Sequence, residues 1–189
     1  MKIAVDVNGV LIDNMENVIE VVNRKYNSNY KKEDVNNWEF YKEWNFSERE
    51  FFDIFYKTYE EMDKVKFIDP EAPNFMKKLT EFHEVNILSA LNDQFEALVK
   101  NKLERHNIIE GIHYNEMIIV AEKPWDLKVK HRFDLYIDDN PNLVNPIKKM
   151  KDRFLFLFDQ PWNYNIENHD NIIRVHNWKE IYKNINNLE

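Results

Sequence analysis

The sequence predicts an α/β fold: a doubly wound, Rossmann-like parallel sheet with a small helical cap inserted after its first strand. Short apolar runs alternate with segments of helical periodicity along most of the 189 residues. Such alternation is typical of a parallel sheet covered by helices on both faces. An aromatic-rich stretch interrupts it after the first strand. We therefore expect a core domain of residues 1–13 and 68–189, and a cap of residues 14–67.

The first strand is predicted to end in a carboxylate and a tight turn. The apolar run of residues 2–5 leads into Asp6, Asn8 and Gly9, and Gly9 is one of the two glycines of the chain. Glycine lets the backbone turn where a Cβ atom would clash. An ordinary hairpin turn can have the same residues, so the motif alone leaves that interpretation open. At the end of a buried parallel strand, it predicts a phosphate-binding crevice.

The insertion is predicted to be helical. Apolar positions with a helical period run from Asn14 to Tyr26. Ser47 and Glu50 form the Ser-x-x-Glu pattern of a capping box, which predicts a helix from there to about Met62. Between residues 27 and 67 the chain is rich in Trp, Phe and Tyr. Aromatic residues at helical spacing usually form a core, so these residues predict that the insertion packs on itself.

The rest of the chain is predicted to alternate between strands and helices. Strands are expected at residues 84–88, 117–120, 133–137, 153–158 and 172–175, and helices up to about residue 82 and at 93–105, 125–131, 143–149 and 178–187. In such a sheet the ligand lies beyond the carboxyl ends of the strands. The polar residues at those ends are Asp6, Asn8, Ser89, Asp138 and Asp139. An acidic cluster with one hydroxyl is typical of a site for a hard cation and phosphate.

Composition narrows the classes of chemistry and of partner. The chain has no cysteine, which excludes thiol nucleophiles, disulfides and thiolate metal sites. Its formal charge is −8 and its lysines are scattered, so no duplex nucleic acid is expected as a partner. No apolar run approaches the ~18 residues of a membrane span, and the first residues do not resemble a signal peptide. We expect a soluble, cytoplasmic protein with no membrane partner.

Three segments resemble motifs of the haloacid dehalogenase-like phosphatase superfamily, and more narrowly of the 5′(3′)-deoxyribonucleotidases. The segments DVNGVL (residues 6–11), ILS (87–89) and DLYIDD (134–139) resemble the first, second and fourth family motifs. The run DQPWN (159–163) resembles a late family segment, and the insertion lies where the family has its helical cap. The resemblance spans nearly the whole chain. It implies a Mg²⁺-dependent phosphatase whose substrate is a nucleotide or a similar small phosphomonoester.

The resemblance also implies the roles of single residues. Asp6 would be the nucleophile that forms an aspartyl-phosphate. Mg²⁺ would be held by Asp6, the backbone carbonyl of Asn8 and Asp139, with Asp138 beside them as a partner of these ligands. Ser89 would donate its hydroxyl to a phosphate oxygen.

A lysine would neutralise the transferring phosphoryl group. Lys128 precedes Asp139 by 11 positions, the spacing that the family resemblance implies. Lys123 and Lys130 are the alternatives. A surface charge without a role in the site is the ordinary interpretation of any single lysine.

The sequence departs from the family pattern at Asn8. Superfamily phosphatases normally have an aspartate there, which protonates the leaving oxygen and then activates water. An amide cannot do either, and such acid–base help is typically worth ~10²–10⁴ in rate. Three explanations of Asn8 remain open: the chain is a natural variant of weak or different activity, it is a catalytically silent phosphate-binding relative, or the residue is an engineered change. Action on another phosphometabolite or on a nucleic-acid end is an alternative to a nucleotidase.

A second departure concerns the recognition of the base. The deoxyribonucleotidases have an aromatic residue soon after the first motif, and Asn14 stands at the corresponding position here. The cap aromatics Trp38, Phe40, Tyr41 and Trp44 could supply a stacking surface instead, worth ~1–3 kcal/mol per stacked base. A role in the core of the cap is the alternative for each of them.

Overall fold

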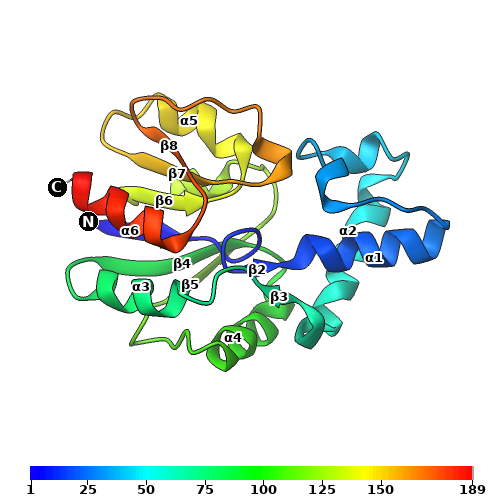
Figure 1. Ribbon diagram of the computed structural model, residues 1–189, viewed down its shortest axis with the longest axis horizontal. Helices are drawn as coiled ribbons and strands as arrows, with labels where there is room; N and C mark the ends of the chain where they lie inside the picture. The colour runs from blue at the N-terminus through cyan, green and yellow to red at the C-terminus, as the bar shows by residue number, and fades with distance from the viewer. Residues whose placement is uncertain (189) are drawn as a thin grey trace.

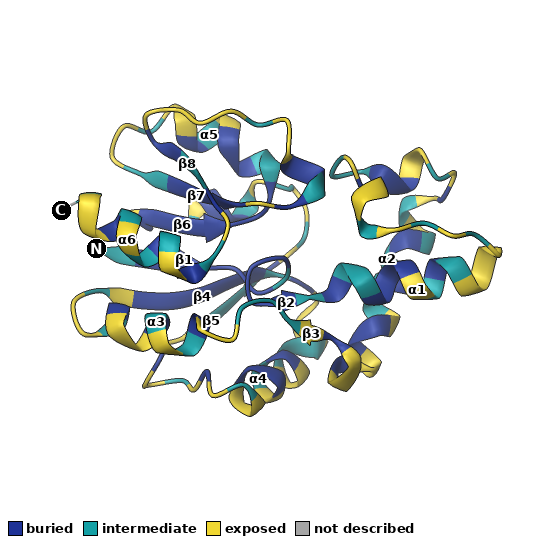
Figure 2. Cartoon of the chain, viewed as in Figure 1, coloured by how far each residue is buried: buried dark blue, intermediate teal, exposed yellow. Residues whose placement is uncertain are grey.

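The computed structural model describes residues 1–188, and its centre is a parallel sheet of six strands in the order β5-β4-β1-β6-β7-β8 (Figure 1). The strands are β1 (Lys2–Val5), β4 (Glu84–Ala90), β5 (Met117–Val120), β6 (Leu135–Asp138), β7 (Phe154–Phe158) and β8 (Ile172–Val175). Most residues of these strands are buried or partly buried (Figure 2). The predicted parallel α/β fold is confirmed.

Helices cover both faces of this sheet. The helices of the chain are α1 (Asn14–Tyr26), α2 (Glu48–Glu60), α3 (Ala72–Thr80), α4 (Glu96–Arg105), α5 (Val144–Lys148) and α6 (Trp178–Leu188). Successive side chains of a strand point to opposite faces. In β1, Ile3 and Val5 belong to the buried cluster formed with α3, α4 and α6, whereas Ala4 belongs to the cluster formed with α5. The sheet is therefore doubly wound, as predicted.

The strand order places the ends of β1 and β6 together. After β1 the chain forms β4 and β5 on one side, then returns to form β6 on the other side of β1. Ligands of open α/β sheets bind where the order reverses in this way. The register pairs Val5 with Ile137, and the Asp6 amide donates to the Ile137 carbonyl at 2.9 Å. Asp6 and Asp138 therefore leave the sheet side by side.

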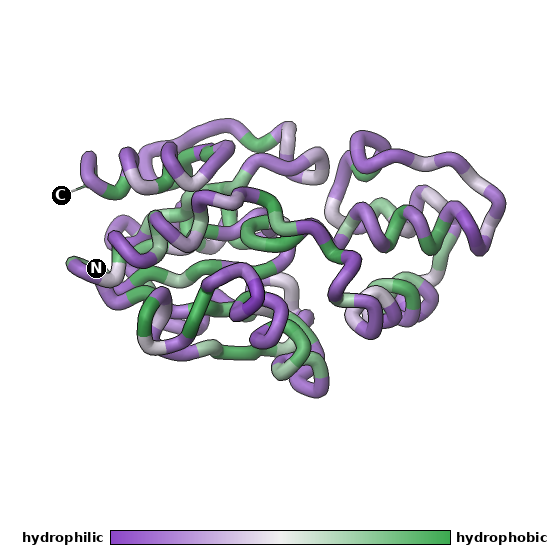
Figure 3. The backbone as a smooth tube through the Cα atoms, turned by 60° about the horizontal axis from the view of Figure 1, so that its bottom comes forward, coloured by the Kyte–Doolittle hydropathy of each residue, from purple (hydrophilic) through white to green (hydrophobic). Residues whose placement is uncertain are grey.

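Residues 14–67 form a helical segment beyond the carboxyl ends of the strands, at the right of Figure 1. Helices α1 and α2 pack together over a buried cluster that includes Val18, Val22 and Ile54. The segment joins the core through a short antiparallel pair, β2 (Ile12–Asp13) and β3 (Lys66–Phe67). Apolar and polar residues alternate along its helices (Figure 3). The strands of the sheet are mostly apolar in sequence. The predicted cap boundaries fall at this β2–β3 pair.

Most predicted elements agree with the structure, and the differences are local. The helix expected at 125–131 is a short 3₁₀ turn, Leu127–Lys130, whose Lys128 side chain is drawn into the site described below. The helix expected at 143–149 is Val144–Lys148, and the Asn171 amide donates to the carbonyls of Ile147 and Met150 at its end, at 2.8 and 2.9 Å. None of the helices in residues 1–188 combines the length and apolarity needed to cross a bilayer.

Candidate active site

Three carboxylates meet at the carboxyl ends of β1 and β6. Asp6 follows β1, Asp138 ends β6 and Asp139 comes next. One oxygen of each lies within 4.8 Å of the others, and all three residues are buried. The sheet register and the strand order produce this cluster from two segments more than 130 positions apart, as the sequence predicted.

Lys128 is the cation of the cluster. Its Nζ lies 2.8 Å from Asp6 Oδ2 and 2.7 Å from Asp138 Oδ2, and its side chain is 3% exposed. Burial disfavours the ammonium, but the charges of Asp138 and Asp6 outweigh that penalty and raise the pKa of Lys128. Of the three candidate lysines, the structure brings Lys128 into the site. Lys130 is exposed, and Lys123 pairs with Glu48 of the helical segment.

Ser89 holds the nucleophile candidate in place. Its hydroxyl donates to Asp6 Oδ1 at 2.9 Å, and the amide of Val7 donates to the same oxygen at 2.7 Å. The side chain of Ser89 is fully buried at the end of β4 and does not line the cavity described below. The expected donation from Ser89 to a phosphate oxygen is therefore replaced in this structure by a hydrogen bond that orients Asp6.

Asp139 is fixed by the segment after β7. Trp162 Nε1 donates to its Oδ2 at 2.9 Å, and Asn163 Nδ2 donates to its backbone carbonyl at 2.8 Å. Gly9 passes so close that an added Cβ would lie 2.1 Å from Asp139 Oδ2. The resemblance of residues 159–163 to a late family segment was the sequence signal that pointed to Trp162 and Asn163, and it assigned them no role.

The cluster has the donors and the charge deficit of a divalent cation site. Among the described residues, three carboxylates share one ammonium, so the cluster carries a net negative charge when all three are ionised. Burial raises the pKa of Asp138 to about 7, with Lys128 offsetting part of the effect. Burial and the neighbouring charge of Asp6 raise the pKa of Asp139 well above its usual range. A hard cation bound to the carboxylate oxygens would offset the repulsion between the three carboxylates, so the residues present fit Mg²⁺.

Asp138 differs from the other two carboxylates in its partners. Its Oδ2 contacts Lys128, and its Oδ1 accepts from the amide of Asn140 at 3.0 Å. Both of its oxygens are therefore occupied. Asp6 also has partners on both oxygens, but Asp6 and Asp139 line the cavity described below and Asp138 does not. This position agrees with a supporting role for Asp138.

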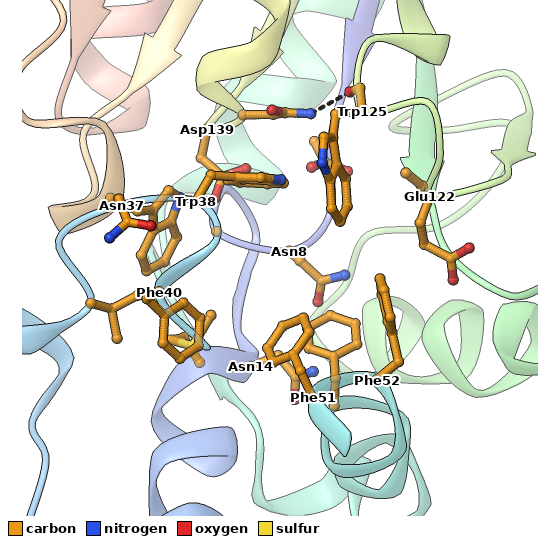
Figure 4. A pocket seen from close by; sticks show the side chains of 18 of the residues that line it. Asn8, Asn14, Asn37, Trp38, Phe40, Phe51, Phe52, Glu122, Trp125 and Asp139 are labelled. Carbon is orange, nitrogen blue, oxygen red and sulfur yellow. Dashed lines mark hydrogen bonds between the residues drawn. The ribbon is translucent and has the colours of Figure 1, made fainter. Parts of the chain in front are cut away.

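A cavity of about 110 Å³ joins this cluster to the aromatic side chains of the helical segment (Figure 4). It is lined by Asp6, Asn8, Gly9, Asp13, Asn14, Met15, Val35, Asn37, Trp38, Phe40, Phe51, Phe52, Phe55, Ala90, Glu122, Trp125, Lys128, Asp139, Asn140 and Trp162. One end is charged and the other is largely aromatic. This polarity suits a ligand with an anionic group and a flat apolar part.

Asn8 projects into this cavity between Asp139 and the aromatic residues (Figure 4). Its Nδ2 donates to the Tyr59 hydroxyl at 2.5 Å, while its Oδ1 is buried without a hydrogen-bond partner among the described residues. Burial raises the pKa of Tyr59, so its hydroxyl stays protonated. Neither group exchanges a proton at neutral pH, so the site contains no acid or base at this position.

The expected substrate-binding residues divide between the cavity and the core of the helical segment. Asn14, Trp38 and Phe40 line the cavity. Tyr41 does not: it is fully buried and stacks on Phe51 with ring centroids 4.9 Å apart. Trp44 also lies outside the lining and stacks on Tyr30. Tyr41 is thus a core residue, and we retain no binding role for it.

Part of the cavity wall, in the segment after β5, was not predicted from the sequence. Trp125 stacks on Phe52 with ring centroids 6.2 Å apart and meets Trp38 edge-on at 5.9 Å. Its carbonyl accepts from Asn140 Nδ2 at 2.8 Å, the dashed contact of Figure 4. Glu122 lies on the same wall. No local motif marks these residues, because their role depends on the helical segment folding over the end of the sheet.

Comparison with known proteins identifies the relatives of the chain. Residues 1–188 match the family described as 5′ nucleotidase, deoxy (pyrimidine), cytosolic type C protein. The chain is 24% identical over 188 residues to YqfW of Bacillus subtilis (strain 168), a protein provisionally named a nucleotidase. The match covers 99% of this chain and 94% of YqfW.

Solved structures of the haloacid dehalogenase-like group have the same fold. A family hydrolase from Streptococcus pneumoniae gives a TM-score of 0.66 at 12% identity, covering 97% of each chain. A protein of unknown function from Agrobacterium tumefaciens gives 0.64 at 11% identity, covering 98% of this chain and 97% of its own. YfnB of Bacillus subtilis, provisionally a hydrolase of this group and solved bound to magnesium, gives 0.59 at 12% identity, covering 98% of each chain.

Proposed function

We propose a nucleotide-directed function for this chain, which belongs to the 5′ nucleotidase, deoxy (pyrimidine), cytosolic type C family. As a member of that family it is a phosphatase, a hydrolase of phosphoric monoesters. We propose further that its substrate is a small nucleotide, that it uses Mg²⁺ and that it works through an aspartyl-phosphate. It would act in the cytoplasm, as the family description implies.

The observation that supports this proposal is the continuity of one cavity. The same cavity is lined by Asp6, Lys128 and Asp139 at one end and by Trp38, Phe51 and other aromatic residues at the other end. A phosphate at the charged end and a base among the aromatic rings would fit a single nucleotide. A phosphomonoester without a ring would leave the aromatic end unfilled.

In the proposed reaction, an Asp6 oxygen forms a bond to phosphorus while the bond from phosphorus to the ester oxygen breaks. The leaving oxygen takes a proton from water to form the alcohol, and water then hydrolyses the aspartyl-phosphate to restore Asp6 and release inorganic phosphate. Ser89 and the amide of Val7 hold Asp6 in place through its Oδ1. Lys128, already 2.8 Å from Asp6 Oδ2, offsets the negative charge of the transferring group.

Asp6, Asp139 and the backbone carbonyl of Asn8 would hold Mg²⁺. When bound, the cation supplies charge neutralisation for a phosphate oxygen. The buried charge deficit of the cluster supports this assignment. So does the magnesium found in the structural relative YfnB.

Residues 14–67 would act as a cap that closes the aromatic end of the cavity. Trp38, Phe40, Phe51, Phe52 and Phe55 of this segment contribute to the cavity lining. Removal of water from the site would strengthen the interactions between Lys128 and the phosphoryl group.

A catalytically weak phosphate-binding protein is the second candidate, and Asn8 is the observation that favours it. With an amide at this position, the leaving oxygen must take its proton from water, and no side chain there activates the water of the second step. Binding of Mg²⁺ and phosphate uses other atoms and would survive.

The test is phosphate release, with and without Mg²⁺, from a panel of 5′- and 3′-nucleotides, both ribo and deoxy, and of phosphate esters without a base. The variant Asp6→Asn is measured beside the unmodified protein. We expect Mg²⁺-dependent release from at least one nucleotide and none from Asp6→Asn. Activity that persists in Asp6→Asn would contradict the aspartyl-phosphate. Release from phosphate esters without a base, and from no nucleotide, would contradict the proposed substrate.

A further inference from the structure

We propose that Asn14 determines the substrate specificity of this site, because its side-chain amide hydrogen-bonds the polar edge of the substrate's ring. This inference rests on the proposed function and specifies how the organic part of the substrate is recognised. It assigns to an amide a task that the family resemblance gives to an aromatic residue.

The geometry of Asn14 leaves one end of its amide unpaired inside the cavity. Asn14 is the first residue of α1, is 2% exposed and lines the cavity. The hydroxyl of Thr58, on α2, lies 2.7 Å from Asn14 Oδ1 and fixes that end. The Nδ2 end is buried and has no hydrogen-bond partner in residues 1–188. Thr58 thus fixes the oxygen end of this cavity-lining side chain, and the nitrogen end is left for a ligand to bind.

The Thr58 contact does not depend on which way round the amide lies. The same hydroxyl is 2.6 Å from the Phe55 carbonyl, and a hydroxyl has one hydrogen to donate. If that hydrogen goes to Asn14, the amide presents its NH₂ to the cavity. If it goes to Phe55, the amide can turn over, donate to Thr58 and present its carbonyl. Both ends are hydrogen-bonding groups, so a ring with polar edge atoms can satisfy either.

A buried amide without a partner destabilises the folded protein, because it has lost its hydrogen bonds to water. Phe51 and Phe52 line the cavity beside Asn14, and Leu has the same branched side chain as Asn without a polar group to leave unpaired. Asn8 shows the same feature, since its Oδ1 is also buried and unpartnered at this cavity. Two unpaired amides at one cavity indicate a ligand that supplies their missing hydrogen bonds.

The surroundings of Asn14 specify what kind of ligand this is. Phe51 and Phe52 lie beside it in the cavity (Figure 4). A flat ring can stack on aromatic faces and direct its polar edge at an amide, whereas an aliphatic polyol cannot stack. Asp6 and Lys128 line the same cavity, so the ring and the phosphoryl group belong to one molecule. These features fit a nucleotide whose base is recognised by hydrogen bonding.

The experiment compares two substrates of the same shape. Thymidine 5′-monophosphate has a base with polar edge atoms, and its analogue with difluorotoluene in place of thymine keeps the shape but scarcely hydrogen-bonds. We expect kcat/KM to be at least about fivefold higher for the thymidine nucleotide, the effect of leaving one buried polar group unpaired. In Asn14→Leu this ratio is expected to approach one. The control is Asn17→Leu, a buried asparagine one turn later on α1 that does not line the cavity, which keeps the ratio.

An unchanged ratio in Asn14→Leu would overturn the inference, as would equal rates for the two substrates in the unmodified protein. If the unmodified protein hydrolyses neither substrate, the same ratio is measured in Kd, through quenching of the fluorescence of the cavity tryptophans. In that case the proposed reaction is wrong, but the ratio of the two Kd values still tests the role of Asn14. If no nucleotide binds, the proposed role of Asn14 is overturned as well. Should Asn14→Leu melt far below the unmodified protein, Asn14→Ser takes its place in both measurements.

Discussion

Asn8 follows β1 and lines the cavity. Its amide nitrogen donates to the Tyr59 hydroxyl, and its buried oxygen has no hydrogen-bond partner in residues 1–188. Neither an amide nor a buried phenol transfers protons near pH 7. The nucleophile candidate, the lysine and the acidic cluster are otherwise in place around it. A single atom of one side chain therefore separates this site from one with an acid–base carboxylate.

The variant Asn8→Asp is expected to raise kcat for nucleotide hydrolysis by ~10²–10⁴, the usual effect of positioned acid–base catalysis. The Tyr59 hydroxyl would then donate to the new carboxylate. Phosphate release at saturating Mg²⁺ measures the effect, with Asn8→Asp combined with Asp6→Asn as the inactive control. No gain in Asn8→Asp would mean that proton transfer does not limit the rate.

Gly9 shows how closely the turn after β1 packs on the acidic cluster of Asp6, Asp138 and Asp139. Its φ is +76°, and a Cβ there would lie 2.1 Å from Asp139 Oδ2. Gly111 provides a matched control, since its φ is +78° and nothing lies within 4 Å of an added Cβ. The two positions have the same backbone strain and differ in steric contact.

Gly9→Ala is therefore expected to destabilise the protein more than Gly111→Ala, by about 1–3 kcal/mol of overpacking, on top of the cost of a positive φ that both share. Urea denaturation of the two variants measures the difference in the free energy of unfolding. Mg²⁺ affinity should also fall in Gly9→Ala alone, because Asp139 must move. Equal unfolding free energies would show that the turn can shift away from Asp139.

At the scale of the elements, α2 provides much of the aromatic wall and begins with the capping box that the sequence predicts. The Glu50 amide donates to the Ser47 hydroxyl at 3.3 Å, and the Ser47 amide donates to Glu50 Oε2 at 2.9 Å. These bonds satisfy two backbone amides that a helix start leaves unpaired. Phe51 and Phe55 follow in the next two turns of α2 and line the cavity. The capping box therefore fixes the point at which this part of the cavity wall begins.

Ser47→Ala is expected to lower the free energy of unfolding by about 1 kcal/mol, because the hydroxyl acceptor is lost. Ser47→Thr keeps the hydroxyl and should retain most of that stability. Thermal or urea unfolding monitored by circular dichroism compares the two. If Ser47→Thr is as unstable as Ser47→Ala, the loss of stability does not arise from the N-cap hydrogen bond of α2.

At the scale of the whole molecule, the sheet order and the position of the helical segment create the site. β1 and β6 are neighbours although more than 120 residues separate them, and their ends place Asp6, Asp138 and Asp139 together. The buried negative charge of this cluster opposes folding in the absence of a counter-ion. Mg²⁺ binding should therefore stabilise the entire fold.

At about 100 times its Kd, Mg²⁺ is expected to add about 2.7 kcal/mol to the free energy of unfolding, which raises the Tm by about 5–10 °C for a chain of this size. Asp139→Asn should lose most of the difference between melts with Mg²⁺ and with EDTA. Asp170→Asn, at an exposed position outside the cluster, should keep it. A Tm that does not respond to Mg²⁺ would exclude a cation site of useful affinity.

The sequence by itself determined the sheet, its helices and the acidic end of the site. Local signals were sufficient there: apolar runs of strand length, the helical period of residues 14–26, and the capping box at Ser47. Asp6, Asp138 and Asp139 could be expected together because each follows a predicted strand, and the carboxyl ends of parallel strands share one edge. Lys128 was identified through the family spacing alone.

Only the tertiary structure decided which side chains face the ligand. Tyr41 and Trp38 belong to the same aromatic segment, yet one is fully buried in its core and the other lines the cavity. Ser89 pairs with Asp6 instead of facing the cavity, and Trp125 joins the wall from a separate loop. Residue type and spacing predict burial on a helix or strand, but the facing of a side chain depends on what packs against it. That neighbour comes from a distant part of the chain, so no local pattern specifies it.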